Sequence, residues 1–187
     1  MSKLIDNAII FAAEKHSGKT RKFGTTPYIV HPMEVAAVIA SITDDEEVIA
    51  AGLLHDTVED THTLPGEIKE KFGERVYELV LSETEDKMSD RPPVDTWYER
   101  KKATLEGLEK AEDEGVKILW LADKLSNLRS FQRQQQKSND TFWQKLNQKD
   151  KNMHKWYYES VLRSVKELEG TQAYSEFSYL LNSIFGG

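Results

Sequence analysis

The sequence predicts an all-α fold, a helical bundle that forms one domain over residues 1–187. Segments with apolar residues at every third or fourth position recur along the chain, and this is the period of a helix with one buried face. No segment predicts a strand of consequence, and neither a repeat nor a linker marks a domain boundary. With 39% hydrophobic residues among 187, the chain can bury one core of its own.

Three helices are expected in the first third of the chain. Residues 2–15 repeat apolar side chains at helical spacing, and Ser2 begins them as an N-cap. Residues 32–41 form the second helix, because a proline suits the first turn. The third, at residues 48–60, opens with an almost wholly apolar run, so we expect it to lie deep in the core.

Shorter and more polar segments follow. Residues 67–72 and 74–81 are expected to form two short helices separated by Gly73 at a C′ position, with Thr63 as the preceding cap. Residues 82–95 are charged and contain two adjacent prolines, so we expect this loop to be the most mobile part of the chain.

Helical spacing dominates the remainder. It returns at residues 100–110 and again at 116–132, where an apolar stripe predicts a buried helix. Residues 134–151 are rich in amides and lysines and predict a polar connection. Amphipathic segments at residues 152–168 and 173–185 predict two helices that close the domain.

Composition limits the classes of function. The absence of cysteine excludes disulfides, thiolate zinc sites and a cysteine nucleophile. No apolar run approaches the length of a membrane span, and the first residues lack a signal-peptide pattern, so we expect a cytoplasmic protein with no membrane partner. A net charge of −7 weighs against a nucleic-acid polymer as partner, but a cleft with a metal and local cations can still bind a small anion. The oligomeric state is left open.

The most informative stretch is His-Asp-Thr-Val-Glu-Asp at residues 55–60, the end of the predicted buried helix. Positions four apart share a helix face, so His55 lies under Glu59 and Asp56 lies under Asp60. Three carboxylates this close together repel one another unless a cation neutralises them. A divalent metal held by His55 and Asp56 would supply that charge, and Glu59 and Asp60 would then lie where an acid can orient or deprotonate a water.

Each of these candidates also has a structural alternative. The acids at residues 55–60 would also fit a solvated helix end, although the apolar Gly-Leu-Leu turn before them argues against it. His31, just before a predicted helix start, fits a core histidine as well as a ligand. Asp123 borders a buried stripe, with Asn127 four residues later on the same face, and it fits a solvated acid as well as a metal ligand.

Three cations, Lys19, Arg21 and Lys22, lie in a loop at residues 17–24 that also contains two glycines. The loop lacks the Gly-x-x-x-x-Gly-Lys-Ser/Thr pattern of a nucleotide-triphosphate cradle. The function of the three cations therefore depends on what they face in the fold.

Four motifs together resemble a known family. They are His-Ser-Gly-Lys-Thr-Arg-Lys at 16–22, Pro-Tyr-Ile-Val-His-Pro at 27–32, His-Asp-Thr-Val-Glu-Asp at 55–60 and Leu-Ala-Asp-Lys-Leu-Ser-Asn-Leu-Arg at 121–129. In this order and spacing they resemble the hydrolase motifs of RelA/SpoT-type proteins, within the HD-domain metal-dependent phosphohydrolases. The resemblance covers roughly residues 5–177 and leaves no room for a synthetase or regulatory domain. The chain thus resembles the small alarmone hydrolases, the stand-alone class that includes the metazoan SpoT homologues.

The resemblance implies an activity and a set of site residues. The activity is hydrolysis of the 3′-pyrophosphate of (p)ppGpp to GDP or GTP and pyrophosphate, which ends the stringent-response signal, with one Mn2+ as cofactor. By position, the implied metal ligands are His31, His55, Asp56 and Asp123, and the implied catalytic acids are Glu59 and Asp60. The implied nucleotide contacts are Arg21, Lys22, Asn127, Lys124, Arg129 and Tyr157. We add Lys19, which with Arg21 and Lys22 would neutralise the pyrophosphate.

The chain departs from the small family members at residues 87–95. Those members tend to run from an Asp-Lys pair to a Trp-x-x-Arg-Lys stretch with little between, whereas here Met-Ser-Asp-Arg-Pro-Pro-Val-Asp separates the two. The departure falls on the rim that would face the substrate.

Other functions remain open beside this one. Within the same class, the substrate could be an adenosine alarmone, because no residue in the sequence is seen to read the base, or the 2′-phosphate of NADPH. In a different class, the chain would be a metal-binding regulatory module without turnover, but the intact Glu59–Asp60 pair argues against this. A metal-dependent nuclease is disfavoured by the net charge of −7.

Overall fold

The computed structural model describes residues 3–186, and over these residues the chain is helical. The elements in order are α1 (Lys3–Lys15), α2 (Val30–Ala40), α3 (Glu46–Asp60), α4 (Pro65–Phe72), α5 (Glu74–Glu83), α6 (Pro93–Lys110), α7 (Glu114–Ser138), the 3-10 helix η1 (Asn139–Lys145), α8 (Lys151–Ser164), the 3-10 helix η2 (Lys166–Leu168) and α9 (Gln172–Phe185). Extended pairing within residues 3–186 is limited to one isolated bridge between Thr20 and Pro27. The all-α prediction is confirmed. No helix in this part of the chain is long and apolar enough to cross a membrane.

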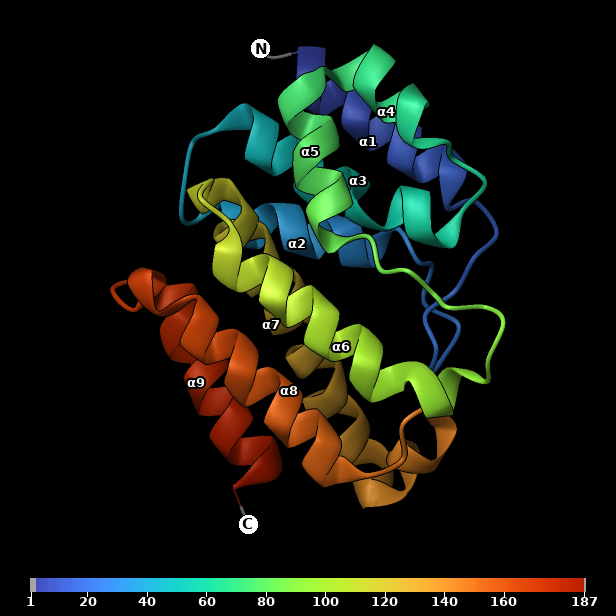
Figure 1. Ribbon diagram of the computed structural model, residues 1–187, viewed down its shortest axis with the longest axis vertical. Coiled ribbons are helices and arrows are strands. Elements are labelled where there is room, and N and C mark those ends of the chain that lie inside the picture. Colours follow the sequence, from blue (N-terminus) through green and yellow to red (C-terminus); the bar gives the residue numbers. More distant parts are fainter. Residues whose placement is uncertain (1–2, 187) are drawn as a thin grey trace.

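The helices form two groups joined by α7. Helices α1 to α5 gather at one end of the molecule, and α6, α8 and α9 lie at the other end (Figure 1). Helix α7 passes behind α6 in this view and packs against α2, α3 and α5 of the first group and against α8 and α9 of the second. Any side chain on the middle of α7 can therefore face residues of both groups.

Helices α3 and α7 supply the centre of the core. Helix α3 packs against α1, α2, α5 and α7, and its residues from Ala50 to His55 are all buried, as its apolar run predicted. Helix α7 buries the whole predicted stripe, which consists of Ile118, Leu121, Ala122, Leu125 and Leu128. Because both helices are central, their polar residues are carried inward as well, and His55 and Asp123 are only 3% and 4% exposed.

Two predicted boundaries are wrong, each for a packing reason. Helix α6 begins at Pro93 rather than near residue 100, because the proline suits the first helical position and Trp97 is buried on the added turn. Helix α7 continues to Ser138 and η1 follows it, so the segment at 134–151 is not simply a polar connection. Its two aromatic residues, Phe142 and Trp143, are buried in the core.

The predicted caps fared unevenly. Gly73 separates α4 from α5 with a positive φ of 93°, as expected for a glycine there. The N-cap of α4 is Leu64 rather than Thr63. The hydroxyl of Thr63 instead forms a hydrogen bond of 2.7 Å with the hydroxyl of Thr61. His31 is the second residue of α2 rather than a residue before it. The predicted cap at Ser2 lies outside the described residues.

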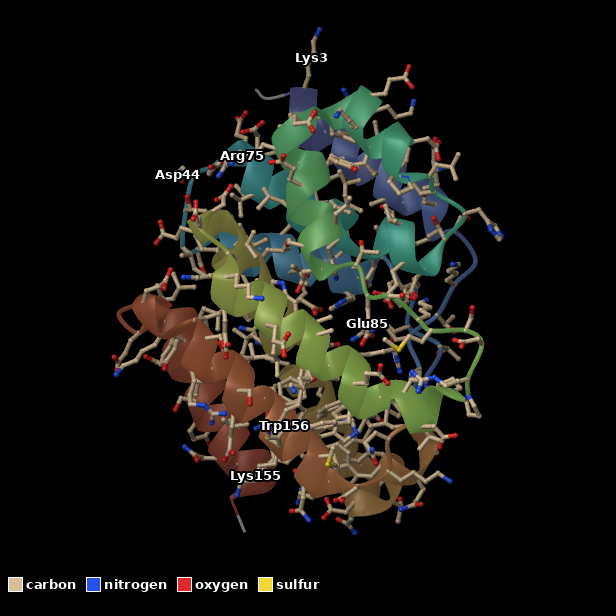
Figure 2. All side chains as sticks on the ribbon, in the orientation of Figure 1. Lys3, Asp44, Arg75, Glu85, Lys155 and Trp156 are labelled. Atoms are coloured by element: carbon tan, nitrogen blue, oxygen red, sulfur yellow. The ribbon has the colours of Figure 1, made fainter. Side chains whose placement is uncertain are left out.

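One arginine ties together the starts of α3 and α7. Asp45 caps α3 by accepting a hydrogen bond from the Glu47 amide, and Asp113 caps α7 by accepting one from the Gly115 amide. Arg75 of α5 lies beside the α2–α3 connection (Figure 2) and bonds Asp45 at 2.7 Å and Asp113 at 2.9 Å. The two central helices are therefore held in register by their caps as well as by their apolar faces.

Helices α2 and α3 approach each other closely at Gly52. A Cβ atom at this position would lie 2.4 Å from Cδ1 of Ile39 and 3.4 Å from Cα of Ala36. The absence of a side chain at Gly52 thus lets α2 lie directly against α3, which sets the distance between the residues that the two helices carry.

We predict that Gly52→Val destabilises the fold by about 1–3 kcal/mol, because the new side chain must push α2 away or distort the buried Ile39. Urea unfolding followed by circular dichroism measures this. Gly107→Val is the control, since a Cβ at this exposed position of α6 meets nothing within 4 Å, and its change should stay within about 0.5 kcal/mol. Equal losses in the two variants would contradict the close approach of α2 and α3.

Candidate active site

Three helices bring together two histidines and two aspartates, which we call the His/Asp cluster. His31 comes from α2, His55 and Asp56 from α3, and Asp123 from α7. Nε2 of His31 and Nε2 of His55 lie 3.0 and 3.6 Å from Oδ1 of Asp123, and 3.5 and 3.1 Å from Oδ2 of Asp56. Ligand atoms of His31, His55 and Asp123 all lie within 4.8 Å of one another. One cation can therefore reach them together.

Hydrogen bonds behind each ring fix which nitrogen faces the cluster. Nδ1 of His55 lies 2.9 Å from the carbonyl oxygen of Gly52, which can only accept, so this nitrogen carries the proton. Nδ1 of His31 lies 2.9 Å from the Ser126 hydroxyl, which donates its own proton to Glu34 at 2.7 Å, so Nδ1 of His31 must donate as well. In the neutral rings both Nε2 atoms therefore present lone pairs to the cluster.

Lone pairs and carboxylates facing one another require a positive charge between them. Nε2 of His55 is buried without a hydrogen-bond partner. Burial lowers the pKa of His55, but the nearby Asp56 and Asp123 carboxylates raise that pKa well above its usual value. A set of imidazole nitrogens and carboxylate oxygens without thiolates fits a divalent metal ion. The residues present therefore fit a divalent cation.

Asp123 is oriented by two residues of its own helix. Asn127 donates from Nδ2 to Oδ1 of Asp123 at 2.8 Å, and the Lys124 ammonium contacts the other oxygen, Oδ2. Burial alone would raise the pKa of Asp123, but the charge of Lys124 and the two histidines bring it well below the usual value. Lys124 is itself buried and also lies 3.3 Å from Glu83. This ammonium, predicted to contact substrate, is engaged by two carboxylates.

Glu59 and Asp60 lie one turn beyond the cluster, at the end of α3. Burial and the charge of Asp56 raise the pKa of Glu59 above its usual value. The Lys87 ammonium donates to the backbone oxygen of Glu59 at 2.9 Å and to Oδ1 of Asp60 at 3.1 Å. The two acids therefore lie beside the His/Asp cluster, and Lys87 from the α5–α6 connection contacts both of them.

A cavity of about 550 Å3 opens next to this acid pair. A smaller space of about 170 Å3 surrounds the His/Asp cluster, and Arg21, Tyr28, Glu59 and Asn127 line both. The cavity wall also carries the apolar and aromatic side chains Phe23, Trp97, Phe131 and Leu146. A molecule in the cavity could therefore contact both apolar side chains and the acid pair.

The structure brings five of the seven predicted nucleotide contacts to these two spaces: Arg21, Lys22 and Asn127 line the larger cavity, and Lys124 and Tyr157 line the smaller space. Arg21 donates to Oδ1 of Asn127 at 3.0 Å, and Lys22 stands on the wall of the larger cavity. Tyr157 lines the smaller space, with the Lys101 ammonium 5.1 Å from its ring centre. Arg21 and Asn127 therefore form the direct link between the loop at residues 17–24 and Asp123.

The remaining predicted cations lie behind the site. The Lys19 ammonium contacts the backbone oxygen of Asp60. Arg129 pairs with Glu176 at 2.7 Å and with Glu34 at 3.1 Å, and Glu34 in turn accepts from the Ser126 hydroxyl that holds His31. Arg129 is thus placed behind His31 rather than on the cavity wall.

A protein-family model described as an HD domain matches residues 8–148. The chain belongs to the HD-domain family. The resemblance that the motifs indicated is thereby confirmed, and His31, His55, Asp56 and Asp123 all lie within the matched region.

Named HD-family relatives agree with the narrower resemblance. The chain is 39% identical over 165 residues to the mouse guanosine-3′,5′-bis(diphosphate) 3′-pyrophosphohydrolase MESH1, with 86% of this chain and 82% of that protein covered. It is 43% identical over 127 residues to an Aquifex aeolicus protein named guanosine-3′,5′-bis(diphosphate) 3′-pyrophosphohydrolase, with 68% of this chain covered. The chain spans only 18% of that bacterial protein, and 17% of a Brucella ovis GTP pyrophosphokinase.

Solved structures share the fold over nearly the whole chain. A structure described as a metazoan ortholog of SpoT that hydrolyses ppGpp superposes with a TM-score of 0.72 at 28% identity, covering 100% of this chain and 96% of that one. The Listeria monocytogenes EGD-e protein lmo0812 gives a TM-score of 0.73 at 31% identity, with 84% and 99% covered. The helical arrangement described above is therefore one that solved proteins adopt.

Sequence reasoning missed several residues of this HD-domain site. Tyr28, Lys87, Trp97 and Lys101 line its spaces, and Glu85 accepts from Arg100 at 2.9 Å on the same wall. Glu85 follows α5 and lies near α6 in Figure 2, in the segment that was expected to be a mobile loop. The signal available was Trp97 and Arg100 at helical spacing directly after that polar segment.

We predict that Arg100→Met costs about 3 kcal/mol of folding free energy, because Arg100 and Glu85 are each only 9% exposed and the variant leaves a buried carboxylate with Lys101 alone. Urea unfolding of the single variant and of Arg100→Met with Glu85→Met measures this, and the double variant should recover much of the loss. Lys102→Met, which breaks an exposed pair on the same helix, should cost less than about 1 kcal/mol. A single variant as stable as this control would contradict a buried ion pair.

Proposed function

We propose that this chain is a metal-dependent hydrolase that removes the 3′-pyrophosphate from guanosine 3′,5′-bis(diphosphate), giving GDP and pyrophosphate, and GTP from the pentaphosphate. The observation that carries the proposal is the His/Asp cluster, with two imidazole lone pairs aimed at carboxylates beside a second acid pair and a cavity. The names of relatives that are 39% and 43% identical support the same reaction. Removal of this nucleotide would end the stringent-response signal.

His31, His55, Asp56 and Asp123 would hold the metal in this proposal. Bound there, a divalent cation would lower the pKa of a water and offset negative charge on the reacting phosphate. Mn2+ suits a donor set of two imidazoles and two carboxylates that leaves positions open for water and substrate, whereas zinc favours a closed tetrahedral set.

The acid pair would handle the proton of the reaction. Water adds to the phosphorus next to the ribose 3′-oxygen, the bond from phosphorus to that oxygen breaks, and the 3′-oxygen gains a proton. Glu59 and Asp60 stand beside the cluster and would orient the attacking water and accept its proton. The pKa of Glu59 is raised toward neutral pH, which suits a group that takes up and releases a proton.

The charges on the cavity wall suit a phosphate-rich substrate. Arg100 and Lys101 are engaged by Glu85, and Lys87 is engaged by Glu59 and Asp60. The partner of Arg21 is the neutral amide of Asn127, so its full charge is available to a ligand. We assign Arg21 and Lys22 to the pyrophosphate, whereas Lys19, whose ammonium contacts the backbone oxygen of Asp60, would support the acid pair.

Asn127 would contact the ribose or a phosphate oxygen, and Tyr157 would contribute to the wall near the metal. Lys124 and Arg129 would act through Asp123 and Glu34 rather than by touching the nucleotide. The cytoplasmic location and the boundaries of one domain over residues 1–187 stay predictions.

We predict Mn2+-dependent release of pyrophosphate from guanosine 3′,5′-bis(diphosphate), lost with EDTA and in Asp56→Ala, which removes one proposed ligand. The measurement converts released pyrophosphate to phosphate with inorganic pyrophosphatase and reads phosphate colorimetrically. The adenosine alarmone, which would also release pyrophosphate, and NADPH, which would release phosphate directly, are compared as substrates. Asp44→Ala, at an exposed position before α3, is the control and should keep full activity.

Each other result of this assay has a definite meaning. Faster turnover of the adenosine alarmone or of NADPH would replace the guanosine substrate with one of those two. Mn2+ binding without turnover of any of them would replace the hydrolase with a regulatory module.

We predict that Glu59→Gln and Asp60→Asn each lower kcat by about 10²- to 10⁴-fold while Mn2+ affinity stays within about twofold, because these residues would move a proton without binding the metal. Steady-state kinetics and Mn2+ titration measure the two quantities. Glu70→Gln on the exposed face of α4 is the control. A large loss of Mn2+ affinity in either variant would make that acid a ligand, and unchanged turnover would remove its catalytic role.

A further inference from the structure

Tyr28 connects the two acidic groups of the site. It lies three residues before His31, in the turn that leads into α2, and its hydroxyl is 2.6 Å from Oδ2 of Asp56 and 3.0 Å from Oδ2 of Asp60. Asp56 belongs to the His/Asp cluster and Asp60 to the acid pair. Tyr28 therefore contacts a proposed ligand and a proposed catalytic acid with one oxygen atom.

The backbone of Tyr28 is fixed on both sides. Its amide donates to the carbonyl oxygen of Lys19 at 2.9 Å, and its carbonyl accepts from the amide of His31 at 2.9 Å. The first bond ties Tyr28 to the loop that carries Arg21, and the second ties it to the first turn of α2. The Cα position of Tyr28 therefore moves only if the loop or the helix moves with it.

The ring of Tyr28 is fixed as firmly as its backbone. It stacks on the buried His16 ring, with centroids 4.7 Å apart and planes at 28°, and meets the His31 ring edge-on at 6.0 Å. The Arg21 guanidinium lies 5.4 Å from the ring centre on another side. Surroundings of this kind leave the hydroxyl no freedom to swing away from the two aspartates.

A phenol has one proton to donate, so it cannot donate to both carboxylates at once. The shorter distance, 2.6 Å, assigns the donated bond to Asp56. This bond directs Oδ2 of Asp56, the oxygen that lies 3.1 Å from Nε2 of His55. Oδ2 of Asp60 then lies 3.0 Å from the oxygen of Tyr28. The other oxygen of Asp60, Oδ1, accepts a hydrogen bond from Lys87 at 3.1 Å.

We infer that Tyr28 is a positioning residue of the site, which orients Asp56 toward the metal and sets the distance between the metal ligand and the catalytic acid Asp60. The inference rests on the proposed function. In this role Tyr28 touches neither the proposed metal ion nor the attacking water. It acts through its contacts with Asp56 and Asp60. Hydrogen-bond partners of metal ligands typically contribute about ten- to a hundredfold to metal affinity or activity.

The test is Tyr28→Phe, which keeps the ring on His16 and removes only the hydroxyl. We expect Mn2+ affinity, measured by titration calorimetry, to fall about tenfold or more, and kcat at saturating Mn2+ to fall while KM for the nucleotide stays within about twofold. Tyr77→Phe on α5 is the matched control, since its ring lies under Lys69 and away from the cluster, and it should change neither quantity. Thermal unfolding of both variants shows whether the fold is kept.

A second variant separates the contact of Tyr28 with Asp56 from its contact with Asp60. Tyr28→Phe combined with Asp60→Asn should lower kcat less than the product of the two single effects, because both changes disturb one interaction. Unchanged Mn2+ affinity together with unchanged kcat in Tyr28→Phe would overturn the inference, as would fully multiplicative effects with unchanged Mn2+ affinity. A wild type that binds Mn2+ but releases no pyrophosphate would contradict the proposed function alone, and Mn2+ affinity would still decide the role of Tyr28.

Discussion

Two histidine lone pairs and two carboxylates face one another in the interior of this fold. The electrostatic repulsion among these four groups is the constraint on which the rest of the site depends. The rings cannot turn away, because Gly52 and Ser126 hold their Nδ1 atoms. The carboxylates cannot reach solvent freely, because Asp123 is 4% exposed and Asp56 lies under Tyr28. A buried arrangement of this kind needs positive charge beside its carboxylates, and a divalent cation would supply it. Electrostatics therefore makes the fold and the metal site depend on each other.

The helices that carry these residues are held by contacts some distance from the cluster. Arg75 joins the N-caps of α3 and α7 and so fixes where each helix starts. Gly52 lets α2 lie against α3, which brings His31 to within 3.5 Å of the Asp56 carboxylate. A helix is stiff over these lengths, so a shift at a cap would move the proposed ligands that lie two to three turns further along the helix. The geometry of the cluster is thus a property of the whole helix packing.

The fold and the cluster were predictable from the sequence because both follow from local patterns. Apolar spacing placed α3 and α7, and His55 and Asp56 follow a buried run that carries them inward. The resemblance then joined His31 and Asp123 to them. The site residues that come from turns, loops and helix ends were not predictable in this way. Tyr28, Glu83 and Lys87 reach the site from a turn, a helix end and a loop, where no periodicity exists to say which way a side chain faces.

The same reasoning explains the predicted cations that are held by carboxylates. Lys124 and Arg129 follow Asp123 and Asn127 in the sequence, but a helix turns 100° per residue, so their side chains leave the helix in other directions. Lys124 still lines the smaller space and contacts Oδ2 of Asp123. Lys124 points to Glu83, and Arg129 points to Glu34 and Glu176. Asn127, one turn after Asp123, shares its face and reaches Arg21. In a helical site, a motif therefore names the site residues at spacings of three and four, and the residues between them support the ligands from behind.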